Sequence, residues 1–351
     1  MKYTIEITIA GCSTNCAHCY VDGGYAKPMS FEDYKRCIKK IKPLLDTLDN
    51  CAVTLGNEIF CNPDIFKILE YSKNQIGKHF SYESYYVPTT GIALLSKSNK
   101  KDIIDMLKSV GAKGFMLALH GNEANHNLIV DNRNGYKKIF ETADFVLQEN
   151  LDVLYNVIVS KKLIPDFDLT LKEIEAVGGK PRLTVPIFVP TKRMRKYQAV
   201  RADIKDCYRI VETSSQHGID TASLLNHCKL HTEKALAEII ENGTFNLKEE
   251  LISSPEWMFL NVTKNLNLYY GNAGAHTLYI GNLNNLKCDE IIDTVKKLPS
   301  NYDYTAYFSK DDFLEVTSLV KSIIPDQLVY PSYSDCICNI LDKNRVKSIL
   351  L

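Results

Sequence analysis

The sequence of 351 residues contains no apolar run of the roughly 18 residues that a membrane-spanning helix needs. Its first residues, Met1-Lys2-Tyr3-Thr4-Ile5-Glu6, lack the apolar segment of a secretory signal peptide. Net charge is also absent, because 42 Lys and Arg balance 42 Asp and Glu. We therefore expect a cytoplasmic protein with no nucleic-acid partner and no membrane partner.

A disulfide framework is equally unexpected. The eleven cysteines are an odd number in a chain without a signal peptide, whereas disulfide scaffolds pair an even number in secreted proteins. Three of the eleven, Cys12, Cys16 and Cys19, lie within eight residues at the spacing C-x3-C-x2-C. Three thiolates this close cannot all point into a core, so we expect them to converge on a soft cation.

The number of local ligands favours an iron–sulfur cluster at this loop. A structural zinc site normally has four protein ligands, often as two C-x2-C pairs. His18 could supply the fourth ligand, but its neighbour Cys19 must point at the metal, so the histidine should diverge. Three cysteines fit a [4Fe–4S] cluster with one iron open to an outside ligand. A non-catalytic zinc- or cluster-binding protein is the alternative.

Strand-like and helix-like segments alternate over the first 210 residues. Strands are predicted at 3–10, 51–55, 82–87, 114–119, 151–159 and 183–189, and helices at 31–48, 63–75, 100–110, 136–148 and 167–177. This alternation predicts an α/β fold, a partial (β/α)6 parallel barrel. Ligands of such sheets bind beyond the carboxyl ends of the strands, and the cysteine loop follows the first strand.

The pattern changes in the second part of the chain, which predicts domains at 1–210 and 211–351. Helices are expected at 229–241, 289–298 and 311–323, and strands at 257–262, 266–270 and 277–280, the first two joined as a hairpin. We interpret 211–351 as a smaller α+β domain. The basic stretch 192–196, just before the boundary, is predicted to be a solvated loop.

Motifs at successive strand ends resemble those of the radical S-adenosylmethionine (radical SAM) superfamily. Cys16-Ala17-His18-Cys19-Tyr20 is similar to the SPASM/twitch branch of that family. Gly56-Asn57-Glu58 resembles its GGE motif, Thr89-Thr90-Gly91 its T-N-G motif, and Ala118-Leu119-His120-Gly121 its S-L-H-G motif. The hairpin that ends in Gly281-Asn282 resembles the SPASM/twitch hairpin.

The resemblance implies an enzyme with a [4Fe–4S] cluster and S-adenosyl-L-methionine (SAM) as cofactors. Such an enzyme cleaves SAM reductively to methionine and a 5′-deoxyadenosyl radical, which abstracts hydrogen from the substrate. The substrate is expected to be a small molecule or a peptide, in a biosynthetic or peptide-modifying reaction. The implied electron donor is a flavodoxin- or ferredoxin-type reductant.

The resemblance also implies roles for individual residues. Iron ligation is assigned to Cys12, Cys16 and Cys19. SAM binding is assigned to Tyr20 near the adenine, Gly56, Asn57 and Glu58 at the methionine ammonium, Thr89 and Thr90 at the ribose or sulfonium, and Asn156 at the ribose hydroxyls. No catalytic residue is assigned, since His120 and His126 are expected to be structural.

Three features depart from the family pattern. Asn57 stands in place of a glycine, and asparagine tolerates a positive φ better than most residues. Ala118 replaces a serine that often contacts the SAM carboxylate, so Arg133 or Lys161 is expected there instead. The hairpin carries no cysteine. An auxiliary iron–sulfur cluster would have to use scattered cysteines, namely Cys207, Cys228, Cys288, Cys336 and Cys338; we favour a metal-free substrate-binding domain.

Overall fold

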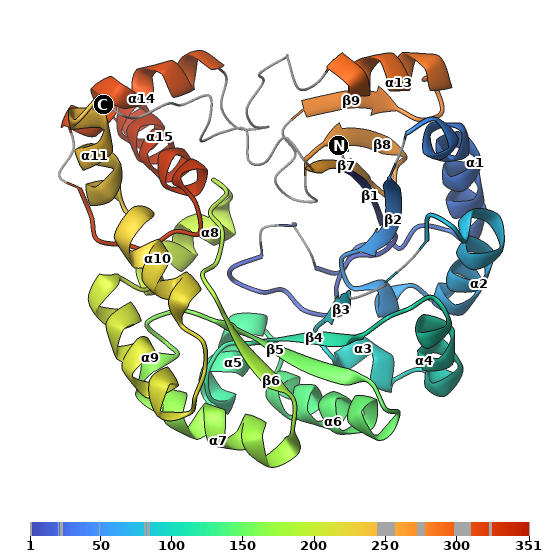
Figure 1. Ribbon diagram of the computed structural model, residues 1–351, viewed down its shortest axis with the longest axis horizontal. Helices are drawn as coiled ribbons and strands as arrows, with labels where there is room; N and C mark the ends of the chain where they lie inside the picture. Colours follow the sequence, from blue (N-terminus) through green and yellow to red (C-terminus); the bar gives the residue numbers. More distant parts are fainter. Residues whose placement is uncertain are drawn as a thin grey trace.

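The computed structural model describes residues 2–19, 21, 24–48, 50–80, 82, 85–243, 257–271, 278–297, 310–322 and 325–350. In this part of the chain the predicted alternation of strands and helices is present, with the strands inside and the helices outside in an open ring (Figure 1). Tyr20 lies outside the described residues. None of the described helices is both long and apolar enough to cross a membrane.

The strands occur in the predicted order. They are β1 (Lys2–Thr8), β2 (Cys51–Gly56), β3 (Tyr86–Thr89), β4 (Gly114–Leu119), β5 (Asp152–Ile158), β6 (Lys180–Thr184), β7 (Trp257–Val262), β8 (Asn267–Tyr270) and β9 (Leu278–Asn282).

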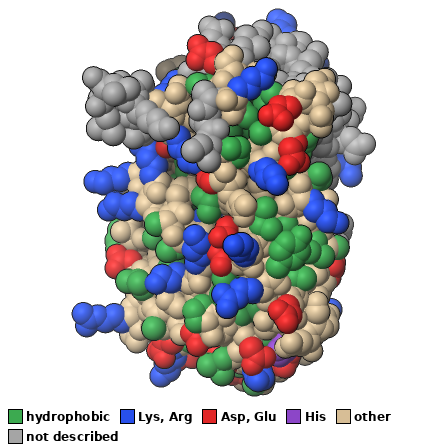
Figure 2. All heavy atoms as spheres, turned by 90° about the vertical axis from the view of Figure 1, so that its left-hand side faces the viewer, with side chains coloured by type: hydrophobic (Ala, Val, Ile, Leu, Met, Phe, Trp, Pro, Cys, Tyr) green, Lys and Arg blue, Asp and Glu red, His purple; other side chains and the backbone are tan. Residues whose placement is uncertain are grey.

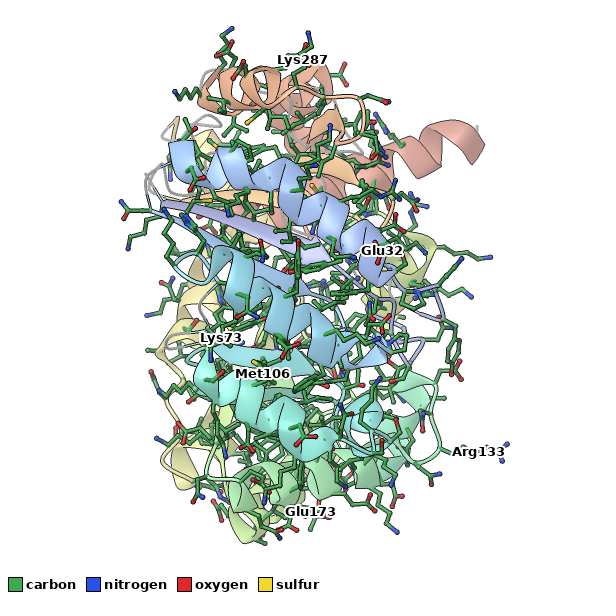
Figure 3. All side chains as sticks on the ribbon, turned by 90° about the vertical axis from the view of Figure 1, so that its right-hand side faces the viewer. Glu32, Lys73, Met106, Arg133, Glu173 and Lys287 are labelled. Atoms are coloured by element: carbon green, nitrogen blue, oxygen red, sulfur yellow. The ribbon has the colours of Figure 1, made fainter. Side chains whose placement is uncertain are left out.

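The helices of the first part follow the strands and cover their outer face. They are α1 (Phe31–Thr47), η1 (Ile59–Cys61), α2 (Ile65–Ile76), α3 (Ile92–Leu95), α4 (Lys100–Ser109), α5 (Glu123–Val130), α6 (Gly135–Gln148), η2 (Ile164–Asp166), α7 (Phe167–Val177), α8 (Lys192–Tyr197), η3 (Gln198–Val200) and α9 (Ile204–Gln216). Viewed from the side, α1, α2, α4 and α6 lie one below another (Figure 3).

The helices of the second part gather mostly on the opposite side of the ring. They are α10 (Ala222–Leu230), α11 (Glu233–Glu241), α13 (Cys288–Lys297), α14 (Lys310–Ser322) and α15 (Tyr333–Leu350). The face that α9, α10 and α11 help to form carries positive and negative side chains in mixture rather than in separate fields (Figure 2).

The strands form two sheets among the described residues. One has the order β2-β1-β7-β8-β9 and the other β3-β4-β5-β6. Within the first six strands all pairing is parallel, as predicted, while β7 and β8 form the predicted antiparallel hairpin. The hairpin is not a separate sheet, because β7 pairs in parallel with β1 from Lys2↔Trp257 to Ile7↔Val262. The predicted boundary at residue 210 therefore stays a prediction.

Two predicted strands are displaced along the chain. The strand predicted at 82–87 is β3 at Tyr86–Thr89, and the strand predicted at 183–189 is β6 at Lys180–Thr184. Both strands contain a proline, Pro88 and Pro181, and both lie at the edges of their sheet. An edge strand tolerates a proline, which has no N–H to donate. The position of β3 and β6 at the sheet edges therefore allows strands that contain a proline, although proline in a sequence argues against a strand.

The basic stretch 192–196 is a helix and not the predicted loop. The Thr191 side chain caps α8 by accepting a hydrogen bond from Met194 N, and the Met194 side chain is fully buried. Met194 belongs to a second hydrophobic core, which we call the helical core, formed mainly by α8, α11, α14 and α15. Arg195 pairs with Asp342 of α15 at 2.5 and 2.8 Å. Residues 192–196 are therefore helical because one face of α8 is buried in the helical core.

Candidate functional site

The cysteine loop lies in the middle of the ring, between the two sheets (Figure 1). Backbone hydrogen bonds fix it at both ends, from Cys12 N to Gly24 O at 2.8 Å and from Ala17 N to Ile129 O at 2.8 Å. At Gly11 a Cβ atom would stand 2.3 Å from Gly24 O, so only glycine allows this close approach. The loop thus rests against the end of α5.

The three thiols are half-buried and electrostatically coupled. The Thr14 hydroxyl lies between two of them, 3.1 Å from Cys12 Sγ and 3.2 Å from Cys16 Sγ. Burial raises the pKa of Cys12 to about 11 and that of Cys16 to about 12, and each is raised further by the charge of Cys19. These thiols ionise only if a cation compensates the charge, which fits the chemistry of a cluster ligand set.

A mononuclear site and a cluster place different demands on the three cysteines. In the described part of the chain, no set of three or more His, Cys, Asp and Glu side chains is arranged to hold a metal ion. Zinc would draw its sulfur ligands to about 2.3 Å from one point. The cysteines of a [4Fe–4S] cluster bind different iron atoms and stand farther apart. The choice of a cluster over zinc at this loop stays a prediction.

Glu58 connects the ends of β2 and β3 to the cysteine loop. Its carboxylate is 4% exposed and accepts hydrogen bonds from Thr89 Oγ1 at 2.8 Å, Thr90 N at 2.6 Å and Thr90 Oγ1 at 2.8 Å. The Thr90 hydroxyl also lies 3.3 Å from Ser13 Oγ in the loop. Burial raises the pKa of Glu58, and the donated hydrogen bonds oppose that shift. Three predicted SAM contacts are thus bonded to one another.

A side chain from the neighbouring strand lies directly over Gly56. A Cβ at Gly56 would lie 2.6 Å from Glu6 Cδ and 2.7 Å from Glu6 Oε1. Glu6 projects from β1 on the inner face, where its Oε1 accepts a hydrogen bond from Asn261 Nδ2 of β7 at 3.2 Å. Gly56 is buried, and the Glu6 side chain covers it on the inside of the ring.

Asn57 confirms the expected tolerance of a positive φ, with a value of 62°. Its Nδ2 donates to Ala10 O at 3.3 Å, which ties the residue to the start of the cysteine loop. Its Oδ1 is buried and has no hydrogen-bond donor among the described residues. A buried acceptor without a donor costs free energy, so this atom fits a ligand that donates, such as the ammonium of SAM.

Asn156 lies on the inner face of β5, where its acceptor atom is already used. Oδ1 receives hydrogen bonds from Arg182 Nε at 3.3 Å, from Arg182 Nη2 at 3.0 Å and from the Thr184 hydroxyl. Only the Nδ2 group of Asn156 remains for a ribose hydroxyl, and that contact stays a prediction.

His18 lies next to the rings of His120 and Tyr197, and the predicted divergence of His18 from the cysteine ligands stays a prediction. Its ring packs edge-on against His120 at 4.3 Å and against Tyr197 at 5.6 Å, and burial lowers the pKa of His18 to about 4. His120 is fully buried and contacts the His126 ring at 5.5 Å. His120 and His126 are buried and His18 is half-buried, and burial lowers the pKa of all three rings. Their structural role stays a prediction.

The residues expected to replace the serine at position 118 do not reach the loop interior. Arg133 and Lys161 are both exposed, and Figure 3 shows Arg133 pointing away from the molecule. The exposed side chain that faces inward near Ala118 is Arg182, which pairs in register with Asn156, itself opposite Ala118. Sequence analysis missed Arg182 and Glu6. The only sequence feature that could have indicated Arg182 and Glu6 was a single charged residue within a strand of alternating apolar and polar residues.

The cysteines of the second part are placed by packing. Cys336 and Cys338 lie in α15 within the helical core, and burial raises the pKa of both thiols. Cys207 and Cys228 are hydrogen-bonded neighbours between α9 and α10 in the main core. Cys288 stands apart at the start of α13.

Comparison with known proteins shows what this fold and this site are similar to. The Radical SAM superfamily matches residues 7–163. No curated protein matches the sequence. Among solved structures, anSMEcpe with bound AdoMet and Cp18Cys peptide aligns with a TM-score of 0.57 and 14% identity, covering 99% of both chains. Streptococcus suis SuiB bound to precursor peptide SuiA aligns at 0.57 and 13%, covering 96% of this chain and 76% of that one.

The matched span contains the cysteine loop, the Glu58 network and strands β2 to β5 complete. This part of the chain matches the radical SAM superfamily, whose members are enzymes that use a [4Fe–4S] cluster and SAM as cofactors. The structural similarity extends over nearly the whole chain, so the fold of the second part is shared as well. At 13–14% identity it shows the fold alone.

Proposed function

We propose that this enzyme cleaves SAM reductively and uses the 5′-deoxyadenosyl radical to take a hydrogen atom from a peptide or small-molecule substrate. The observation that carries the proposal is the bonded connection of three strand-end motifs, from Ser13 through Thr90 to Glu58. It gathers the cysteine loop and the predicted SAM contacts at one edge of the barrel, where ligands of parallel sheets bind.

The cysteine residues of the loop, Cys12, Cys16 and Cys19, would hold the cluster. When bound, the cluster supplies the electron that breaks the S–C5′ bond of SAM. Asn57 Oδ1 accepts from the SAM ammonium, and the backbone of Gly56 lies beside it. Glu58 holds Thr89 and Thr90 in place rather than meeting the ligand directly, because its oxygens are already occupied.

The chain also excludes water around the loop. The half-buried ring of His18 packs against the buried rings of His120 and Tyr197 beside the loop. Exclusion of water protects a primary carbon radical from side reactions. We infer that Tyr20, next in sequence to Cys19, covers the adenine, and that a flavodoxin- or ferredoxin-type protein supplies the electron.

The two related structures with bound peptides support a peptide substrate over a small molecule. We assign the hairpin and helical part after residue 210 to holding that substrate. The inner face of β7 to β9 presents Phe259, which is 39% exposed, and Tyr279, which is 54% exposed. Exposed aromatic side chains provide contact area for a peptide at low entropic cost.

The test is anaerobic reconstitution with iron and sulfide, followed by dithionite and SAM, with 5′-deoxyadenosine measured by chromatography. We expect the wild-type protein to bind about four iron atoms per chain and to form 5′-deoxyadenosine. The triple variant C12A/C16A/C19A should lose both, while the control C288A keeps both. An intact, reducible cluster that forms no 5′-deoxyadenosine would show the proposed function to be wrong.

A further inference from the structure

Arg182 lies on the inner face of the four-stranded sheet, an unusual position for an exposed arginine. In β5 the buried residues Val153, Tyr155 and Val157 belong to the main core. Because side chains alternate along a strand, Asn156 projects from the opposite, inner face. Arg182 pairs with Asn156 in register and shares that face, and its side chain is exposed.

Neutral groups hold the guanidinium in one orientation. Its Nε and Nη2 both donate to Asn156 Oδ1, and Nη2 also lies 2.9 Å from Met116 Sδ. Thr184 donates to the same Asn156 oxygen, which fixes the amide. Orientation by neighbours reduces the side-chain entropy that a ligand would otherwise have to overcome. The arginine is pre-positioned.

The charge of this guanidinium is not compensated by an ion pair in the part of the chain that the structure describes. Its hydrogen bonds go to an amide and a thioether, and its Nη1 group has no hydrogen-bond partner among these residues. Arginine presents planar N–H groups that match a carboxylate or phosphate. The guanidinium is fixed and faces inward, and its Nη1 group has no partner among the described residues. It is therefore suited to bind an oxyanion.

The direction of Arg182 separates this site from the cysteine loop. The guanidinium contacts Met116, two residues before Ala118 in β4, rather than the strand end. It is also close enough to Tyr85, just before β3, to lower the pKa of that phenol against the raising effects of burial and of Glu6. Both contacts lie toward the amino ends of the strands, away from the loop where the methionine part of SAM is expected.

We propose that Arg182 binds a carboxylate of the substrate and so anchors it inside the barrel. The inference rests on the proposed function and adds a substrate class to it: an acidic small molecule, or a peptide with an acidic side chain or its own carboxyl terminus. Arg182 is a binding and specificity residue, and Asn156 and Thr184 are its positioning residues. Cleavage of SAM itself does not require it.

The first experiment uses the reconstituted, SAM-loaded enzyme and three pairs of probes: propionate and propionamide, glutarate and glutaramide, benzoate and benzamide. Binding is measured by titration calorimetry and ligand-detected NMR. We expect at least one carboxylate to bind the wild type at least tenfold more tightly than its amide. R182Q should lose that preference and R182K should keep part of it, while R209Q, an exposed arginine of α9, should behave as wild type.

The second experiment compares SAM with decarboxylated SAM as ligands of wild type and R182Q. Arg182 also orients Asn156, which is predicted to meet the ribose that both ligands share. We therefore expect R182Q to change the affinities for SAM and for decarboxylated SAM by the same factor. Tenfold weaker binding of SAM alone would place the guanidinium on the carboxylate of SAM and overturn the proposal. The proposal would also be overturned if carboxylates bound wild type and R182Q equally well, or if the wild type showed no preference for carboxylates over amides. If the wild type formed no 5′-deoxyadenosine, the proposed function, cleavage of SAM, would be wrong.

Discussion

Replacement of Gly56 by alanine tests the geometry of the site most directly. The new Cβ would lie 2.6 Å from Glu6 Cδ and 2.7 Å from Glu6 Cγ, well inside van der Waals contact. Gly56 is not among the residues with positive φ, so alanine fits its backbone conformation. The whole cost of G56A should therefore come from one side chain, that of Glu6, and should disappear when that side chain is shortened.

Overpacking of this kind costs about 1–3 kcal/mol. The single variant E6A removes the hydrogen bond from Asn261 Nδ2, which is worth about 1 kcal/mol. In the double variant G56A/E6A the clash is absent, so its loss of stability should equal that of E6A alone. The double-mutant cycle should give a favourable coupling of about 1–3 kcal/mol. The measurements are urea unfolding and SAM affinity of the reconstituted protein.

Gly114 provides a matched control. Its Cβ would meet a backbone atom, Asp152 O, at 2.0 Å rather than a side chain. Shortening Asp152 cannot relieve that contact, so G114A/D152A should show no rescue. If G56A and E6A are additive, or if G56A is as stable as the wild type, the inward position of Glu6 over Gly56 is wrong.

Two further predictions concern buried and surface hydrogen bonds. T89V removes a hydroxyl that donates to the buried Glu58 carboxylate and accepts from Gly91 N, and should cost about 2–3 kcal/mol in urea unfolding; a loss below 0.5 kcal/mol would contradict the network. His217 lies 2.7 Å from Glu175 and 2.8 Å from Asp168, and these carboxylates raise its pKa. Its protonated form is favoured in the folded state, so its stabilisation is complete below the unfolded pKa of about 6.5 and is lost as pH rises through the higher folded value. H217Q should therefore lose more stability at pH 5.5 than at pH 8.5, and an equal loss at both would refute this sign.

The local motifs could be read from the sequence because each depends on neighbours in the chain. The spacing of Cys12, Cys16 and Cys19 and the positive φ at Asn57 are set within a few residues. The strand and helix periodicities likewise predicted strands β1 to β6 and helices α1, α2, α4, α6 and α7, but not the shorter helices α3, α5 and α8. Because parallel strands share one edge, the order of the motifs also predicted that Glu58 and Thr90 would meet.

Other features depend on contacts that no local pattern contains. Residues 192–196 form a helix because Met194 packs into the helical core. Part of that core comes from α15, which begins more than 100 residues later in the chain. The pairing of β7 with β1 joins strands some 250 residues apart and turns an expected separate hairpin into an extension of the barrel sheet.

The sequence by itself predicted a soft-metal site at the cysteine loop, since three thiols in eight residues can serve few other purposes. Only the tertiary structure decided what surrounds that chemistry. It paired Glu58 with two threonines, set Glu6 over Gly56, and turned Arg182 inward without a carboxylate partner among the described residues. The physical reason is that ligation follows residue type and spacing, whereas burial, clash and charge compensation are properties of side chains brought together from distant strands.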